Sequence, residues 1–191
     1  MSDEVADLFR QVASNMARVA ESSYVQAVDR AAELLSASFA AGQKLLVFGN
    51  GGSSADAQHL TAELVGRFAF DRKPLPAIAL TTNQAILTAW SNDQSFADVF
   101  ARQIDALGAP GDVAWGISTS GTSANVLNGL RRARERGLRT IGMTGESGGD
   151  MASLCDVLLA VPLDSTARIQ EIHLVTYHSI CAALERRLFG R

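Results

Sequence analysis

The sequence predicts an α/β fold in which helices cover both faces of a five-stranded parallel sheet. Short apolar segments alternate with longer segments of helical periodicity, and Gly/Ser/Thr-rich loops follow several of the apolar segments. The apolar segments are hydrophobic almost throughout rather than at every second residue, which is typical of parallel strands buried on both sides. Ligands of such sheets bind at the carboxyl ends of the strands, where these loops lie.

The first 40 residues are expected to form two helices. Apolar residues recur at helical spacing from Val5 to Val19 and again from Val25 to Phe39, no proline interrupts them, and AAGQ at 40–43 ends the pattern. This segment is longer than the cover of one small sheet requires. We therefore expect residues 1–40 to be a helical extension at an interface between subunits.

The strands and their helices follow in alternation. Strands are expected at 44–49, 76–82, 112–118, 139–145 and 156–162. Helices are expected at 54–67, 85–89, 96–107, from the STSGTS loop through Arg136, at 150–154 and at 166–189. Because no linker, repeat or low-complexity segment divides the chain, we expect residues 1–191 to form one domain.

The composition narrows the class of protein. The chain is 47% hydrophobic and 19% charged with a net charge of −3 at pH 7, which is ordinary for a globular protein and unlike a nucleic-acid or membrane-surface binder. No apolar run is long enough to span a bilayer, and the N-terminus does not resemble a signal peptide. Cys155 and Cys181 lie in apolar surroundings, so both are expected to be buried, reduced thiols of a cytoplasmic protein.

The first strand is followed by a loop, Gly49 to Ser54, that is expected to approach a phosphate. A dinucleotide fingerprint would place glycine at Ser54 and an acidic residue at the end of the second strand, which instead ends in Leu80-Thr81-Thr82. The lysine of a nucleotide-binding P-loop is also missing. These differences argue against both nucleotide sites.

A second loop, Ser118 to Ser123 (STSGTS), has five hydroxyl groups in six residues and leads directly into a helix. Hydroxyls and the free N–H groups of a helix N-terminus together suit a phosphate dianion. The alternative is that the hydroxyls cap the helix. Capping requires only one or two of them, so the pattern favours a ligand.

His59 and Glu63 are four residues apart on the first helix after a strand, so they share one face. An imidazole nitrogen and a carboxylate oxygen are both ligands of zinc and similar divalent ions. A surface contact is the alternative for this pair alone. Its position about two turns after a phosphate loop favours a reacting site.

The closing helix offers further polar residues. At 100° per residue, Gln170 and His178 lie about 80° apart, while His173 lies about 60° from Gln170 and about 140° from His178. The two histidines are therefore not expected to face one ion together, and geometry leaves either of them possible. The other would be a supporting or packing histidine.

Asp93 and Arg67 are weaker candidates for ligand binding. Asp93 follows the second strand in WSND and could hold a sugar hydroxyl or cap a loop. Arg67 ends the first helix after a strand and could pair with an anion or complement the helix C-terminus.

Together these segments resemble the sugar isomerase (SIS) family and, within it, the phosphoheptose isomerases. The resemblance covers nearly the whole chain and includes GNGGSSADAQHLTAELVGRF, FDRKPLPAIALTTN, GISTSGTSANV, TGESGGDM and RIQEIH. It implies a flavodoxin-like SIS fold and a homotetramer whose active sites lie between subunits. It also implies one zinc ion per subunit, held by His59, Glu63, Gln170 and His178.

The resemblance further implies which residues bind a sugar phosphate. These are Asn50, Gly51, Gly52, Ser53, Arg67, Asp93, Ser118, Thr119, Ser120, Ser123, Thr166 and Gln170. The chain departs from its relatives at Thr122, where some carry lysine or asparagine, and in WSNDQSF, where an aromatic residue is more usual. The first difference concerns phosphate affinity and the second concerns substrate preference.

The implied reaction converts sedoheptulose 7-phosphate to D-glycero-D-manno-heptose 7-phosphate, the first step of nucleotide-activated heptose biosynthesis. An enediol mechanism needs a carbon base and a group that moves protons between oxygens, and we assign these roles to Glu63 and His178. Two alternatives remain. One is a non-catalytic SIS protein that binds the replication initiator DnaA, and the other is an isomerase of a different sugar phosphate.

Overall fold

The computed structural model describes residues 2–190 and contains the parallel sheet that the sequence predicts. Its strands are β1 (Leu45–Gly49), β2 (Ala77–Ala79), β3 (Val113–Ile117), β4 (Arg139–Thr144) and β5 (Val157–Ala160). They are all parallel, in the order β2-β1-β3-β4-β5. This order is that of the flavodoxin-like folds, so the predicted fold class is confirmed.

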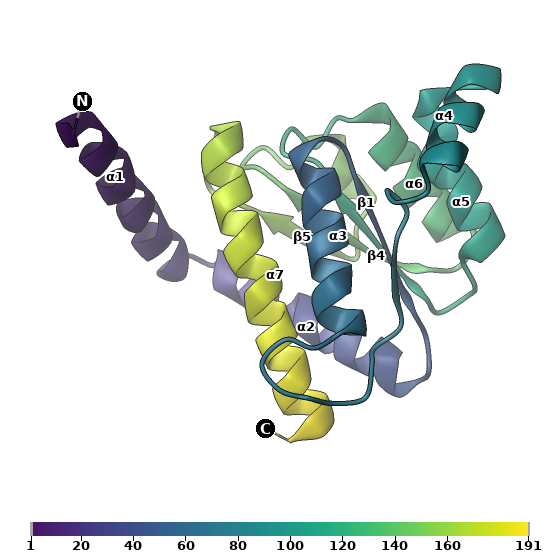
Figure 1. The fold of residues 1–191 in the computed structure, drawn as a ribbon, viewed down its shortest axis with the longest axis horizontal. Coiled ribbons are helices and arrows are strands. Elements are labelled where there is room, and N and C mark those ends of the chain that lie inside the picture. Colours follow the sequence, from purple (N-terminus) through teal and green to yellow (C-terminus); the bar gives the residue numbers. More distant parts are fainter. Residues whose placement is uncertain (1, 191) are drawn as a thin grey trace.

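Helices cover both faces of this sheet (Figure 1). The helices are α1 (Ser2–Ala20), α2 (Tyr24–Ala40), α3 (Gly52–Val65), α4 (Gln84–Asp93), α5 (Val99–Leu107), α6 (Ala124–Glu135) and α7 (Thr166–Phe189), with short 3₁₀ helices η1 (Phe96–Asp98) and η2 (Gly149–Ser153). One buried cluster joins the sheet to α2, α3 and α7, and a second joins it to α5 and α6. Alternate residues of β1 enter the two clusters: Leu45 and Val47 the first, Leu46 and Phe48 the second.

The helix α1 is mostly exposed. It projects away from the body of the molecule (Figure 1), and its Val5, Leu8 and Phe9 side chains are exposed. Only its C-terminal end joins the core, through Met16 and Val19. Both helices expected in the first 40 residues are therefore present.

Several predicted boundaries were wrong. Helix α3 begins at Gly52 and ends at Val65, so Arg67 lies beyond it rather than at its end. Strand β2 has three residues instead of the seven expected. Helix α4 continues to Asp93, because no glycine or proline interrupts the segment after residue 89. The bounds expected for the closing helix are confirmed by α7.

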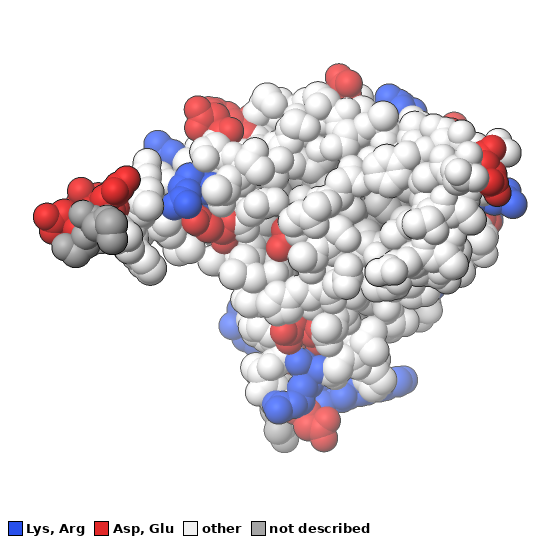
Figure 2. All heavy atoms as spheres, turned by 45° about the horizontal axis from the view of Figure 1, so that its top comes forward, with Lys and Arg blue, Asp and Glu red and all other residues white. Residues whose placement is uncertain are grey.

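In the described part of the chain, neither the surface charges nor the two cysteines point to a further functional site. In the face shown by Figure 2, acidic and basic side chains form small separate groups around a broad uncharged area. Among the described helices, none has the length and apolar character needed to cross a membrane. Cys181 is buried as predicted, whereas Cys155 is only half-buried, and burial raises the pKa of both thiols to about 12.

Candidate functional site

The two loops predicted to bind phosphate lie side by side because their strands are neighbours in the sheet. Gly49 at the end of β1 is in register with Ile117 at the end of β3. A Cβ atom on Gly49 would lie 2.8 Å from both the Ile117 carbonyl oxygen and the Cβ of Ser53. Glycine therefore allows the two strand ends and the buried Ser53 to meet at one place.

The hydroxyl groups of the STSGTS loop bond to one another. Ser118 Oγ lies 2.9 Å from Ser123 Oγ, and Ser120 Oγ lies 2.9 Å from Thr122 Oγ1. Ser123 is the N-cap residue of α6, but its side chain makes no capping hydrogen bond. Capping of α6 by the Ser123 hydroxyl is thus not supported, and the loop hydroxyls lie directly before the N-terminus of α6. Thr119 and Ser120 line a pocket that also includes Gly145, Glu146 and Asp164.

A pair of side-chain amides, one of which the sequence pattern does not single out, joins the two loops. Asn50 and Asn125 exchange two side-chain hydrogen bonds of 2.8 Å, so the predicted ligand-binding Asn50 is held by α6. Asn125 is buried two residues after Ser123, and that proximity to the phosphate loop was the only signal in the sequence.

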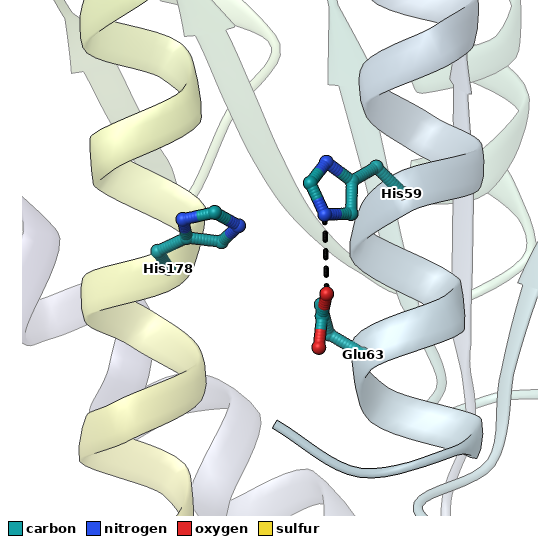
Figure 3. Close-up of side chains that lie close together, drawn as sticks. All are labelled: His59, Glu63 and His178. Atoms are coloured by element: carbon teal, nitrogen blue, oxygen red, sulfur yellow. Dashed lines mark hydrogen bonds and ion pairs between the residues drawn. The ribbon is translucent and has the colours of Figure 1, made fainter. Parts of the chain in front are cut away.

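The structure brings His59, Glu63 and His178 together (Figure 3). The first two point from α3 toward His178 on α7, and one ligand atom from each residue lies within 4.8 Å of the others. His59 Nε2 is 3.1 Å from Glu63 Oε1, and the two imidazole rings are 5.0 Å apart and nearly perpendicular. His178 Nε2 is buried without a hydrogen-bond partner.

Two imidazoles and a carboxylate are a donor set that fits zinc or a similar divalent ion. The unpaired His178 Nε2 supports this, since buried polar atoms normally have a partner. Burial lowers the pKa of His178, the neighbouring His59 lowers it further, and Glu63 partly opposes them. The imidazole is therefore kept neutral at pH 7, the form that binds metal or exchanges protons.

Gln170 contacts the start of α3. It precedes His178 by eight residues on α7, about 12 Å along the helix axis. Its amide packs against the start of α3, where a Cβ on Gly52 would lie 2.4 Å from Gln170 Nε2. Gln170 thus lies beside the loop after β1, about two turns of α7 before His178.

The surroundings of the two histidines of α7 distinguish them where helical angles could not, and they agree with the resemblance, which implied His178. His173 is fully buried, and its Nε2 lies 3.3 Å from the Thr144 carbonyl oxygen. Burial lowers its pKa to about 4, with the Thr144 hydrogen bond opposing the shift. His173 is a packing histidine at the carboxyl end of β4, and His178 is the histidine that faces His59.

The remaining predicted residues lie outside the cluster. Arg67 is exposed beyond the end of α3, and Thr166 is exposed as the first residue of α7. Asp93 lies in the last turn of α4 rather than in a loop, and its carboxylate accepts a hydrogen bond from Asn92. Gly51 is exposed and has a positive φ of 55°, which lets the chain turn from β1 into α3.

Two more residues border the cluster and were not singled out in the sequence. The Tyr177 hydroxyl lies 2.9 Å from His59 Nδ1. Burial raises the pKa of Asp56 to about 6, while a hydrogen bond with Tyr177 and the charge of His59 lower it. Their spacing does contain a signal, because Asp56 is three residues before His59 and Tyr177 directly precedes His178.

The fold and site are those of a sugar isomerase domain. The family model described as SIS domain matches residues 8–145, and the chain belongs to this family.

Comparison with individual proteins narrows the class further. The chain is 50% identical over 187 residues to the phosphoheptose isomerase of Synechocystis sp., covering 98% of this chain and 96% of that protein. It is 58% identical over 158 residues to the phosphoheptose isomerase of Geotalea daltonii, covering 83% and 82%. The structure of phosphoheptose isomerase GmhA from Neisseria gonorrhoeae matches with a TM-score of 0.90 at 42% identity, covering 96% of this chain and 98% of that one. The chain is thus a member of the phosphoheptose isomerases, as the resemblance predicted.

Proposed function

We propose that the chain interconverts sedoheptulose 7-phosphate and D-glycero-D-manno-heptose 7-phosphate as an aldose–ketose isomerase of the cytoplasm. One observation carries the proposal: His59, Glu63 and His178 converge in a chain about half identical, over nearly its full length, to phosphoheptose isomerases. Such an enzyme would supply the first step of nucleotide-activated heptose biosynthesis.

The loops at the carboxyl ends of β1 and β3 would bind the phosphate. Ser53, Ser118, Thr119, Ser120 and Ser123 offer hydroxyls there, and the N-termini of α3 and α6 offer N–H groups. Gly51 and Gly52 keep the first loop small enough for close approach, with Asn50 and Gln170 beside it. Arg67, Asp93 and Thr166 are proposed to contact the sugar in the assembled protein.

His59 is about 10 Å along α3 from Gly52, so the phosphate and the reacting carbons would bind at different ends of an extended substrate. The Glu63 carboxylate would remove a proton from C1 of the ketose and return it to C2. His178, neutral at pH 7, would donate a proton to the oxygen on C2 and accept one from the oxygen on C1. The proton count balances, and the aldose is formed through an enediol.

His59, Glu63 and His178 would hold one zinc ion per subunit, and Gln170 would be the fourth ligand once its side chain has turned away from Gly52. When bound, the ion polarises the substrate carbonyl and stabilises the negative charge that develops on the oxygen.

We also propose a homotetramer with its active sites between subunits. The exposed apolar side chains of α1 and the exposed Leu174 and Val175 of α7 support this, since they offer apolar surface for contact between subunits. Light scattering of the purified protein tests the assembly, and a monomer at micromolar concentration would contradict it.

The test of function is an isomerisation assay on sedoheptulose 7-phosphate with wild type and Glu63→Gln, each before and after chelation and zinc return. Glu63→Gln is expected to lower kcat by roughly 10²–10⁴-fold, the usual contribution of a general base. Glu171→Gln is the matched control, because Glu171 forms an ion pair with Arg168 on α7 and is assigned no catalytic role. Full activity of Glu63→Gln with metal bound would exclude Glu63 as the base. No turnover of any heptulose phosphate, together with binding to a replication initiator, would favour the non-catalytic alternative.

A further inference from the structure

The His59 ring is contacted from both helices: Glu63 on α3 lies 3.1 Å from Nε2, and Tyr177 on α7 lies beside Nδ1. Tyr177 is 1% exposed, and its hydroxyl lies 2.9 Å from His59 Nδ1. The two rings are 5.4 Å apart in an edge-on arrangement. The His59 side chain is 43% exposed, whereas the tyrosine beside its Nδ1 is buried, so the Tyr177 hydroxyl offers a fixed partner for that nitrogen.

Asp56 approaches the same tyrosine hydroxyl from α3. It lies one turn before His59, on the same face of the helix, and its carboxyl interacts with the Tyr177 hydroxyl. Its Oδ2 atom is nevertheless buried without a hydrogen-bond partner. A buried carboxylate oxygen without a donor is costly, and the Tyr177 hydroxyl is a donor that this carboxyl group can reach.

The two tautomers of neutral His59 use these groups differently. With the proton on Nε2, His59 donates to Glu63 Oε1, and Tyr177 must donate to Nδ1, which leaves Asp56 without a donor. With the proton on Nδ1, His59 donates to the Tyr177 oxygen, and the tyrosine proton is free for Asp56. The second arrangement leaves Nε2 and Glu63 available to a cation and changes no proton count.

We propose that Tyr177 and Asp56 are positioning residues that hold His59 as the Nδ1–H tautomer, with Nε2 directed at the metal cluster. Outer carboxylates and hydroxyls that fix a ligating histidine in this way strengthen metal binding by roughly 10–100-fold. The inference rests on the proposed metal site for its affinity consequence, but the hydrogen-bond chain belongs to the protein alone.

The test uses Tyr177→Phe, which keeps the ring and removes the hydroxyl. Tyr24→Phe is the matched control, because Tyr24 is also buried and its hydroxyl bonds to Thr176 at 2.8 Å, away from His59. Zinc affinity is measured by competition with a chromophoric chelator at pH 7.5. Tyr177→Phe is expected to bind zinc roughly 10–100-fold more weakly than wild type, and Tyr24→Phe is expected to bind it equally well.

A pair of variants at Asp56 separates positioning from simple packing. Asp56→Asn keeps an acceptor oxygen and is expected to lose less zinc affinity than Asp56→Ala. Equal losses in the two variants, or a Tyr177→Phe protein that binds zinc within twofold of wild type, would overturn the proposal.

The tautomer itself is measured in metal-free, ¹⁵N-labelled protein by long-range ¹H–¹⁵N NMR of the imidazoles, of which the chain has three. The Nδ1–H population of His59 is expected to fall in Tyr177→Phe and to stay unchanged in Tyr24→Phe. An unchanged population in both variants would overturn the positioning role. If wild type binds no zinc, the proposed metal site fails, and this measurement still decides the role of Tyr177.

Discussion

Gly121→Ala tests how closely the phosphate loop packs on the loop after β4. Gly121 has φ = +69°, and a Cβ at this position would lie 2.4 Å from the Gly148 carbonyl oxygen and 3.0 Å from Gly149 Cα. These are backbone atoms, which cannot rotate away. A left-handed conformation costs a non-glycine residue roughly 1–2 kcal/mol, and overpacking costs roughly 1–3 kcal/mol more. We expect the free energy of unfolding to fall by about 2–5 kcal/mol.

Gly137→Ala provides the matched control for this change. Gly137 has φ = +75°, but its nearest neighbour is Pro110 Cβ at 3.6 Å, an ordinary contact. For Gly137→Ala we expect the free energy of unfolding to fall only by the cost of the left-handed backbone conformation, roughly 1–2 kcal/mol. Urea unfolding at 25 °C and pH 7.5 measures both variants against wild type, and the difference between them isolates the clash. Gly121→Ala should also raise the KM for the sugar phosphate, because it displaces the hydroxyl loop. Equal destabilisation of the two variants would show that the loops are not in the contact described.

Two further predictions concern buried polar groups. Burial lowers the pKa of His173 from about 6.5 in the unfolded chain to about 4 in the folded protein. The folded state therefore gains stability from neutral His173 above pH 6.5. This contribution, about 3 kcal/mol, is lost as the pH falls toward 4. The stability difference between wild type and His173→Gln in urea should therefore shrink from pH 7.5 to pH 5, and a constant difference would contradict the assignment. Glu185 is 2% exposed and accepts hydrogen bonds from the Phe68 and Ala69 N–H groups and from Arg72 Nε. Glu185→Ala should cost roughly 3–5 kcal/mol in urea unfolding, because it leaves the Arg72 charge buried and unpaired, and a cost below about 1 kcal/mol would refute this.

Much of the fold could be predicted because the signals are local. The apolar strands, the length of α7 and the glycine-rich loops each depend on residues within a few positions of one another. Helix ends were harder, since no glycine, proline or capping residue marks where α4 stops, and Asp93 was misplaced as a result. The choice between His173 and His178 could not be made from helical angles, which specify a relative direction but not which face points inward.

The sequence by itself determined the parallel sheet, the two hydroxyl-rich loops at its carboxyl edge and the shared face of His59 and Glu63. The tertiary structure placed His178 opposite that pair, as the family resemblance implied but no local pattern did. Only the tertiary structure buried His173 under β4 and brought Tyr177 and Asp56 to the His59 ring. The physical reason is that α3 and α7 are more than one hundred residues apart in the chain and meet only because both cover the same face of the sheet. Which side chains then converge depends on the packing of the two helices against that common core, and no local pattern encodes it.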